Sequence, residues 1–368
     1  MRCRWHATLL NVMRAVCFVS LLLLAAQAGF GQAAATPSVP TDPHAVLAAA
    51  EPLYDFSDPA MKPWHLKASY QLYDLKGKPA EQGTWEYWWA SPKVHRSTWT
   101  REGATRTDWW TADGALHRKE SGNPLRYFER TLETTLLYPL PPRNIVSSDK
   151  LKIDLKIVPV GKSQLACVGT LLLWNRNGML VAPNSAADEH YCFETSSHAL
   201  RMTYSDSKTA EFSRIVKTQG HYLARQVEVS IGKSKALSVS VDSIDSADLS
   251  DIAFSPPADA VLAQSPVTQR DASDSGNGEV AQGMLLQKTQ PVYPAVAKIS
   301  GQQGDVILAA VIATDGKVHD LEVLAAPSPI LADAALDAVK QWKYRPYLLN
   351  GVPVEVETMI NVVFSLGR

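Results

Sequence analysis

The residues best suited to acid–base catalysis are Asp315, His319 and His221, because carboxylate and imidazole groups exchange protons near neutral pH. Asp315 directly precedes Gly316, and an Asp-Gly pair between two apolar runs is typical of a hairpin turn. Both histidines fall within alternating patterns typical of strands. HExxH, GxSxG and P-loop signatures are absent from the sequence. We therefore predict that the protein is not an enzyme, with hydrolysis at a site inside the β-rich region as the alternative.

The cysteines favour a structural role over a chemical one. Cys3 and Cys17 lie near the N-terminus, which leaves Cys167 and Cys192 as an even pair in the middle of the chain. In an exported protein such a pair predicts one disulfide, which stabilises the fold by roughly 3 kcal/mol. A reactive thiol is the alternative, although no CxxC spacing supports it. The sequence predicts no metal site, because the cysteines and scattered histidines lack ligand spacing.

No cofactor is predicted either. Gly276-x-Gly278-x-x-Ala281 superficially matches a dinucleotide-binding fingerprint, but no strand pattern precedes it and no long helical pattern follows. A net charge of −1, without a basic stripe, argues against a nucleic-acid-binding protein. With 46% hydrophobic and 20% charged residues, a chain of 368 residues has the composition of a globular protein of two or three domains.

Residues 1–34 have the pattern of an export signal. Arg2, Arg4 and Arg14 provide a positive N-terminal region, an apolar run of about 12 residues follows, and Ala26–Ala28 offers a cleavage site of small residues. The alternative is an uncleaved inner-membrane anchor, for which about 20 apolar residues are usual. We expect an exported protein.

The middle of the chain predicts a β-rich domain. After an N-terminal segment, 35–63, the range 64–254 alternates apolar and polar residues in runs separated by Gly, Asp or Asn turns. This period of two is typical of an antiparallel sheet. Leu66, Ala68, Tyr70 and Leu72 alternate with polar residues, and Trp85, Tyr87 and Trp89 would share one face of the next strand.

Residues 255–283 are rich in Pro, Ser, Asp and Gly without periodicity, which is typical of a flexible linker. As a random coil it would span about 30 Å.

The last segment, 284–368, predicts an α+β domain. A short helix is expected at 294–300, a buried strand at Val306–Ala313 and a hairpin turn at Asp315-Gly316. A second helix follows Ser328, carries Trp342 on its apolar face and ends before Pro346.

A final strand is expected at Val352–Leu366, because apolar residues alternate over its whole length. At about 3.3 Å per residue it would extend roughly 50 Å, which is long for a sheet of three or four strands. Part of it would therefore form an edge with unpaired backbone groups. Such an edge is covered by a loop or a second copy of the chain, or it captures an extended peptide.

Several motifs in this segment together resemble the C-terminal domain of the TonB family. They are Gln290-Pro291-x-Tyr293-Pro294, Gly304-x-Val306, Asp315-Gly316-x-Val318, Ala335, Trp342-x-Tyr344-x-Pro346 and Ile360-x-Val362-x-Phe364. The resemblance covers about 285–366. It implies an αββαβ module whose last strand pairs with the TonB-box peptide of an outer-membrane transporter in the periplasm.

The resemblance also assigns roles to residues. It implies partner binding by Gln290, Pro291, Tyr293, Pro294, Val356, Thr358, Ile360, Val362 and Phe364, and structural roles for Gly304, Asp315, Gly316, Trp342, Tyr344 and Pro346. A TonB protein also has an anchor that engages the ExbB–ExbD motor and a long proline-rich spacer. This sequence lacks that spacer. Because the motor contact requires an anchor, we expect ExbB–ExbD as a partner only if residues 1–34 are retained.

The middle domain loosely resembles the periplasmic lipoprotein carriers LolA and LolB, in which a half-barrel encloses a cavity for acyl chains. That resemblance implies a lipid as a candidate ligand. It leaves an alternative function open: a lipid or lipoprotein carrier with the TonB-like module as a localising domain. The plainer expectation is that Trp85, Trp89, Trp99 and Trp109 simply fill the core of a curved sheet.

Overall fold

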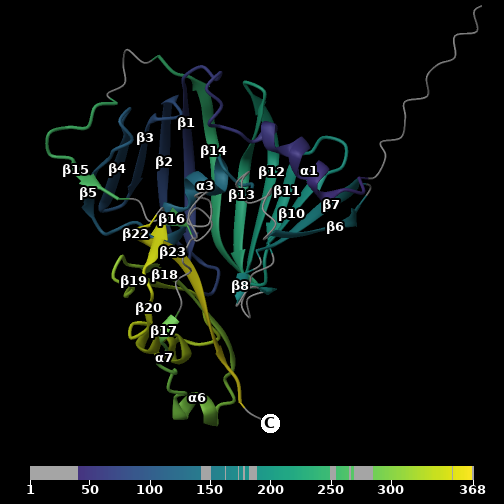
Figure 1. Cartoon of the computed structure of the whole chain (residues 1–368). Coiled ribbons are helices and arrows are strands. Elements are labelled where there is room, and N and C mark those ends of the chain that lie inside the picture. The colour runs from purple at the N-terminus through teal and green to yellow at the C-terminus, as the bar shows by residue number, and fades with distance from the viewer. Residues whose placement is uncertain are drawn as a thin grey trace, which may run out of the picture. The chain divides into compact units, whose positions relative to one another are not determined.

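A computed structural model describes residues 40–141, 151–161, 163–172, 174–176, 179–181, 189–248, 254–264, 267–268, 285–349 and 351–366 (Figure 1). Val39–Arg368 forms one compact unit. The expected export signal, residues 1–34, and the glycine motif at Gly276, Gly278 and Ala281 lie outside the described residues. None of the helices in the described ranges has the length and apolar character needed to span a membrane.

Helices are few and short. α1 begins after Asp42, whose carboxylate accepts a hydrogen bond from the backbone N–H of His44 at 3.0 Å and so caps the helix. The described helices are α1 (Pro43–Ala50), the 3₁₀ turn η1 (Glu51–Leu53), α2 (Tyr127–Arg130), α3 (Leu132–Leu136), α6 (Ala295–Ile299) and α7 (Pro329–Val339).

The largest sheet among the described residues is antiparallel, as the alternating patterns predict. Its described strands lie in the order β15-β5-β4-β3-β2-β1-β14-β13-β12-β11-β10-β7-β6. They are β1 (Trp64–Tyr73), β2 (Pro79–Ser91), β3 (Val94–Arg101), β4 (Ala104–Trp110), β5 (Leu116–Gly122), β6 (Leu151–Val160), β7 (Ser163–Leu172), β10 (Glu189–Glu194), β11 (Leu200–Tyr204), β12 (Lys208–Thr218), β13 (His221–Ile231), β14 (Ser234–Ser246) and β15 (Val261–Ala263), with a separate hairpin of β8 (Trp174–Arg176) and β9 (Met179–Val181).

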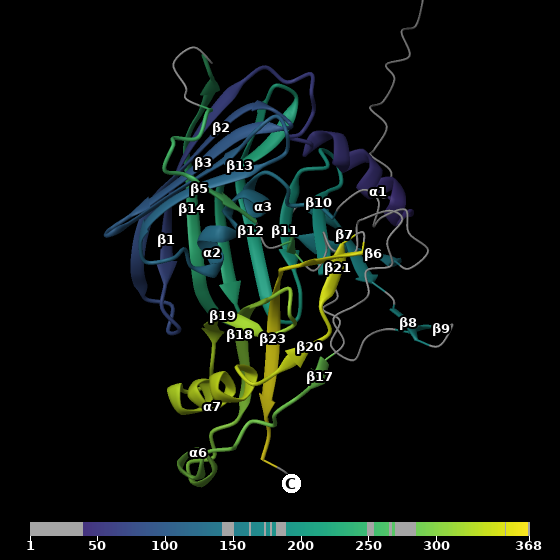
Figure 2. The same ribbon diagram turned by 60° about the vertical axis from the view of Figure 1, so that its left-hand side comes forward.

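The concave face of this sheet carries the main core. Trp64 and Tyr87 stack on neighbouring strands with ring centroids 5.3 Å apart, and both are fully buried. α2 and α3 lie within the curve of the sheet (Figure 2), and Phe128 and Leu132 join the same apolar cluster. Side chains of the described residues therefore occupy the face that, in the LolA-like interpretation, would line a lipid cavity. A lipid ligand stays a prediction.

One of the four tryptophans expected in this core lies elsewhere. Trp85, Trp89 and Trp99 belong to the concave core. Trp109 pairs with Arg96 across β3 and β4, and this register puts it on the opposite face from Trp99. The sequence pattern misplaces Trp109 because two adjacent tryptophans, 109 and 110, cannot share one face of a strand.

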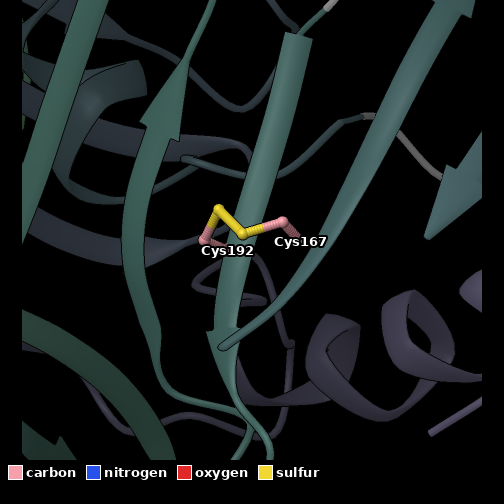
Figure 3. Close-up of a disulfide and its surroundings, with 2 residues drawn as sticks. All are labelled: Cys167 and Cys192. Carbon is pink, nitrogen blue, oxygen red and sulfur yellow. A yellow bond between two sulfur atoms is a disulfide. The ribbon is translucent and has the colours of Figure 1, made fainter. Parts of the chain in front are cut away.

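Cys167 and Cys192 face each other on β7 and β10, and a disulfide joins them (Figure 3). Both side chains are buried, and with Leu165 they form a small cluster that also contacts Met202 and Tyr204. The disulfide thus ties two neighbouring strands close to one end of the large sheet.

The C-terminal segment folds as the predicted αββαβ module with additional short strands. Its sheet has the order β16-β23-β18-β19, and α6 and α7 pack on one face of it. The strands are β16 (Val267–Thr268), β18 (Gly304–Ile312), β19 (Val318–Ala325) and β23 (Val356–Phe364), with the pairs β17 (Leu285–Gln287) and β20 (Lys343–Tyr344), and β21 (Tyr347–Leu349) and β22 (Val352–Val354).

Two predicted boundaries in this module were wrong. The expected single strand Val352–Leu366 is interrupted at Glu355, because β22 turns back to pair with β21 while β23 pairs with β18. The expected second helix ends at Val339, so Trp342 lies beyond it and Lys343 already belongs to β20. A periodic pattern shows which residues share a face, but it does not show where the strand changes partner.

The range expected to be a linker, 255–283, contains two described strands. β15 pairs with β5, and β16 pairs with β23. These parts of the range therefore belong to sheets, in contrast to a random coil. The domain boundaries at 255 and 283 remain predictions.

Candidate functional site

The candidate site is the side of β23 that faces away from β18. β23 pairs with β18 along its whole length, from Val356 opposite Ile312 to Phe364 opposite Gly304. Val356, Ile360, Val362 and Phe364 are buried. This alternation places the apolar side chains against the core and leaves the backbone edge for a further strand.

On its other side, β23 is only partly covered. β16 runs parallel to β23 and pairs with Val356 and Glu357. Among the residues that the structure describes, no strand pairs with this side of β23 from Met359 to Phe364. The outward-pointing backbone groups of this stretch, which come from every second residue, therefore form a free edge, a feature that sheets usually protect or use for binding.

The Gln290–Pro294 segment lies against the far end of this strand. The ring of Tyr293 meets that of Phe364 edge to face, with centroids 5.3 Å apart. The Tyr293 hydroxyl donates a hydrogen bond to the carbonyl oxygen of Gln302, and the ammonium group of Lys298 lies 5.5 Å from the ring centroid. Tyr293 thus packs β23 against α6, and its polar tip is already hydrogen-bonded within the chain.

The same segment begins at the exposed Gln290, contains two prolines and leads directly into α6. Pro294 has φ −62° and ψ 136°, an extended conformation, and it directly precedes the helix. Upstream, the indole N–H of Trp342 donates to the carbonyl of Thr289 at 2.8 Å. This bond places Trp342, a predicted structural residue, under the entry to the Gln290–Pro294 segment.

Gly304 and Gly316 both have backbones that favour glycine, with φ 134° and 83°. A Cβ atom on Gly316 would lie 1.9 Å from the carbonyl oxygen of Tyr344, whose N–H donates to the Gly316 carbonyl at 2.8 Å. Asp315 accepts a hydrogen bond from the Lys317 backbone at 2.9 Å, and the Lys317 side chain lowers the pKa of Asp315. Asp315, Gly316 and Tyr344 therefore form one turn contact, and Pro346 follows it.

The face of the C-terminal sheet opposite α6 and α7 packs against the β-rich domain. Ile307, Leu324 and Met359 contact the same apolar cluster as the large sheet. Ion pairs reinforce this contact: Arg126 Nε lies 2.9 Å from Glu322 Oε1, and Arg130 Nη2 lies 2.5 Å from Glu357 Oε1. Sequence patterns did not reveal these four charged residues, because alternation carries no information about partners in another domain.

His319 and His221 lie on different sheets, β19 and β13, and each has a carboxylate nearby, at 3.7 Å from Asp58 in the case of His221. His319 lies 3.1 Å from Asp320 and 3.5 Å from Glu355 on the C-terminal module. His221 lies on β13, where its Nδ1 is 3.0 Å from the carbonyl oxygen of Pro52. These contacts are those of hydrogen-bonded strand residues. The described residues contain no cluster of His, Cys, Asp or Glu suited to a metal ion.

Comparison with known proteins addresses the C-terminal module directly. Residues 289–366 match the family model for the Gram-negative bacterial TonB protein C-terminal region. Protein TonB of Vibrio cholerae serotype O1 is 32% identical over 84 residues, which cover 23% of this chain and 34% of that protein. The chain therefore spans about a third of the length of this curated relative. The predicted TonB resemblance is confirmed for this module, which we call the TonB-like module.

Solved structures are similar to both parts of the chain. The solution structure of the Pseudomonas aeruginosa TonB C-terminal domain is 26% identical, with a TM-score of 0.20, and the match covers 24% of this chain and 92% of that one. A LolA superfamily protein from Nitrosomonas europaea is 8% identical, with a TM-score of 0.35, and covers 59% of this chain and 99% of that one. A putative outer membrane lipoprotein-sorting protein domain from Vibrio parahaemolyticus gives 8% identity, a TM-score of 0.35, and coverage of 55% and 91%.

Proposed function

We propose that the TonB-like module binds an extended peptide of an outer-membrane transporter by adding it as a strand to the free edge of β23. The observation that supports this proposal most strongly is the run Met359–Phe364, which pairs with β18 on one side and with no described strand on the other. The protein would act in the periplasm, and the proposal assigns it no catalytic step.

The length of the free edge limits the strength of binding. About four backbone hydrogen bonds, each contributing about 0.5–1.5 kcal/mol, would stabilise the complex by about 2–6 kcal/mol. Ordering a flexible peptide offsets several kcal/mol of this. A micromolar complex requires about −8 kcal/mol. Contacts to side chains must therefore contribute as well, and we expect a transient complex.

Side chains beside the free edge supply candidates for these contacts. Val363 is 61% exposed on β23 and Val292 is 82% exposed in the Gln290–Pro294 segment. Tyr293 contributes indirectly, since its ring holds Phe364 and thereby fixes the end of the edge strand. Gln290 is exposed and can hydrogen-bond a peptide backbone.

Whether residues 1–34 are cleaved or retained determines whether the module acts without the ExbB–ExbD motor or together with it. A retained segment would anchor the protein in the inner membrane, where it could engage ExbB–ExbD. A cleaved segment would leave a periplasmic adaptor. The mass of the mature protein distinguishes the two, because cleavage after Ala28 removes a defined N-terminal peptide.

Hydrogen exchange of the full chain tests the binding proposal. Synthetic peptides copied from the periplasmic N-termini of outer-membrane transporters serve as probes. We expect the amides of Met359–Phe364 that point away from β18, which come from every second residue, to exchange more slowly when a peptide is bound. β19 is the matched control, because it forms the opposite edge of the same sheet. Unchanged exchange at β23 under saturating peptide, or equal protection at β19, would overturn the proposal.

The other expected occupant of the edge is a second copy of the chain, and gel filtration of the same protein shows whether such a dimer forms. If β23 pairs between two copies, the hydrogen-exchange protection of Met359–Phe364 is present without peptide and depends on protein concentration. That result would replace peptide capture with self-association.

A further inference from the structure

The first two residues of the candidate edge are already paired with the chain itself. β16 runs parallel to β23, with Val267 opposite Val356 and Thr268 opposite Glu357. The outward backbone groups of an edge strand come from every second residue, and each of them can pair with only one neighbouring strand at a time. A foreign strand that pairs with Val356 or Glu357 must therefore displace β16.

The position of β16 is set by the strand before it. β15 pairs with β5 of the large sheet at Leu116–Arg118, and Lys119 adds an ion pair with Asp259 at 2.7 Å. Only positions 264–266 separate β15 from β16. A two-residue strand pairs weakly by itself, but such a short tether keeps it at a high effective concentration beside β23.

Glu357, which pairs with β16 through its backbone, is also held through its side chain. Glu357 accepts hydrogen bonds from Nε and Nη2 of Arg130 at 2.9 and 2.5 Å. Its side chain is 9% exposed. The start of β23 is thus held both by β16 through the backbone and by α2 through a side chain, whereas Met359–Phe364 pairs with no described strand on this side.

We infer that β16 is a resident competitor for the peptide site. While β16 is paired, an incoming peptide reaches Met359–Phe364 alone. When β16 is released, the site lengthens to include Val356 and Glu357, and binding becomes tighter. This inference rests on the proposed function, which it extends by naming an element of the same chain that regulates access to the site.

A cysteine pair tests whether β16 occupies this position in solution. Val267→Cys with Val356→Cys joins two partners in register, whereas Val267→Cys with Val363→Cys joins positions far apart along the strand. Both pairs are placed in the full chain with Cys3 and Cys17 changed to Ser. We expect oxidation to link the first pair and not the second, as measured by non-reducing peptide mapping. Linkage of neither pair, or of both equally, would overturn the inference.

Release of β16 tests the competition. The double variant Val267→Pro, Thr268→Pro removes both backbone donors of β16 and leaves β23 unchanged. Because successive amides of a strand point to opposite sides, we expect the one of the Val356 and Glu357 amides that faces β16 to exchange at least about threefold faster, and the one that faces β18 to stay unchanged. Fluorescence anisotropy with a labelled transporter peptide should show about tenfold tighter binding, which corresponds to 1.4 kcal/mol. The oxidised form of the register-matched cysteine variant, in which β16 stays linked to β23, should bind no more tightly than the unmodified chain.

The two experiments separate failure of the inference from failure of the proposed function. If the peptide protects β23 but the proline variant binds it with unchanged affinity, the competition is wrong and peptide capture stands. If the register-matched pair links but no peptide protects β23 in any variant, peptide capture is wrong, and the competition falls with it.

Discussion

Arg130 on α2 and Glu357 on β23 form an ion pair that joins the β-rich domain to the strand proposed to bind a peptide, with Nη2 and Oε1 2.5 Å apart. Both side chains are largely buried, at 16% and 9% exposure. Burial raises the pKa of Glu357, and the Arg130 guanidinium opposes this shift. The TonB-like module is therefore attached to its neighbour through the candidate site itself.

Removing one partner of this pair should destabilise the chain. Arg130→Ala leaves the Glu357 carboxylate buried without its guanidinium, which typically costs about 3 kcal/mol or more. Urea unfolding followed by tryptophan fluorescence measures the loss. Lys317→Ala is the matched control, because the Lys317–Asp315 pair is exposed and should contribute much less than the buried pair. Equal unfolding midpoints for the two variants would show that the buried pair is energetically minor.

Gly316 and Gly351 provide a second matched comparison. Both have a positive φ, 83° and 81°, so alanine strains either backbone by about 1 kcal/mol. A Cβ at position 316 also meets the Tyr344 carbonyl oxygen at 1.9 Å, whereas nothing lies within 4 Å at position 351. We expect Gly316→Ala to lower the free energy of unfolding at least about twice as much as Gly351→Ala. A larger loss for Gly351→Ala would contradict the geometry of this turn.

Glu133 predicts a pH dependence of stability. Burial raises its pKa from 4.5 to about 7, and hydrogen bonding from Tyr87 at 3.2 Å only partly opposes the shift. Because the folded state binds the proton more tightly, the free energy of unfolding falls as pH rises from about 4.5 to about 7, by up to about 3 kcal/mol.

Urea unfolding of the wild type and Glu133→Gln between pH 4 and 8 isolates this contribution. The stability of the wild type relative to the variant should be greatest below pH 4.5 and should decline to a constant value above pH 7. Glu102→Gln, at an exposed turn position, is the control for loss of a carboxylate. A relative stability that rises with pH would show that the sign of the Glu133 shift is wrong.

The disulfide should stabilise the β-rich domain. Cys167 and Cys192 are 25 positions apart, so Cys167→Ala with Cys192→Ala should cost roughly 3 kcal/mol through the freer unfolded chain. Thermal or urea unfolding with and without a reductant measures this cost. A reductant should lower the stability of the wild type and leave the double variant unchanged. Equal urea midpoints for the oxidised wild type and the double variant would contradict the prediction.

Local chemistry in the sequence determines much of this fold. Alternation predicts that Trp85, Tyr87 and Trp89 share a buried face, and all three are fully buried. Asp315-Gly316 predicts its hairpin, because few residues other than glycine adopt the required φ. Ser328 predicts the start of α7, where its hydroxyl accepts a hydrogen bond from the Leu331 N–H at 3.4 Å.

The parts that escaped sequence analysis all depend on distant partners. The break at Glu355 follows from β22 pairing with β21, and the alternation of apolar residues continues through it. The β16 strand lies in a range of linker composition and exists through β23. The contact between Arg130 and Glu357 joins residues 227 positions apart. Composition and periodicity describe one segment at a time, so none of these three relations was predictable from them.

Ile307 and Leu324 are buried in the apolar cluster of the large sheet, and the half-buried Met359 packs against the same cluster, which has a mechanical consequence. A tensile force applied along β23 by a captured strand would load its hydrogen bonds to β18 in shear, where they resist together. The same force would reach α2 through Glu357 and Arg130. Any traction on the terminal strand would thus be borne by the curved β-rich domain as well as by the small module that makes the contact.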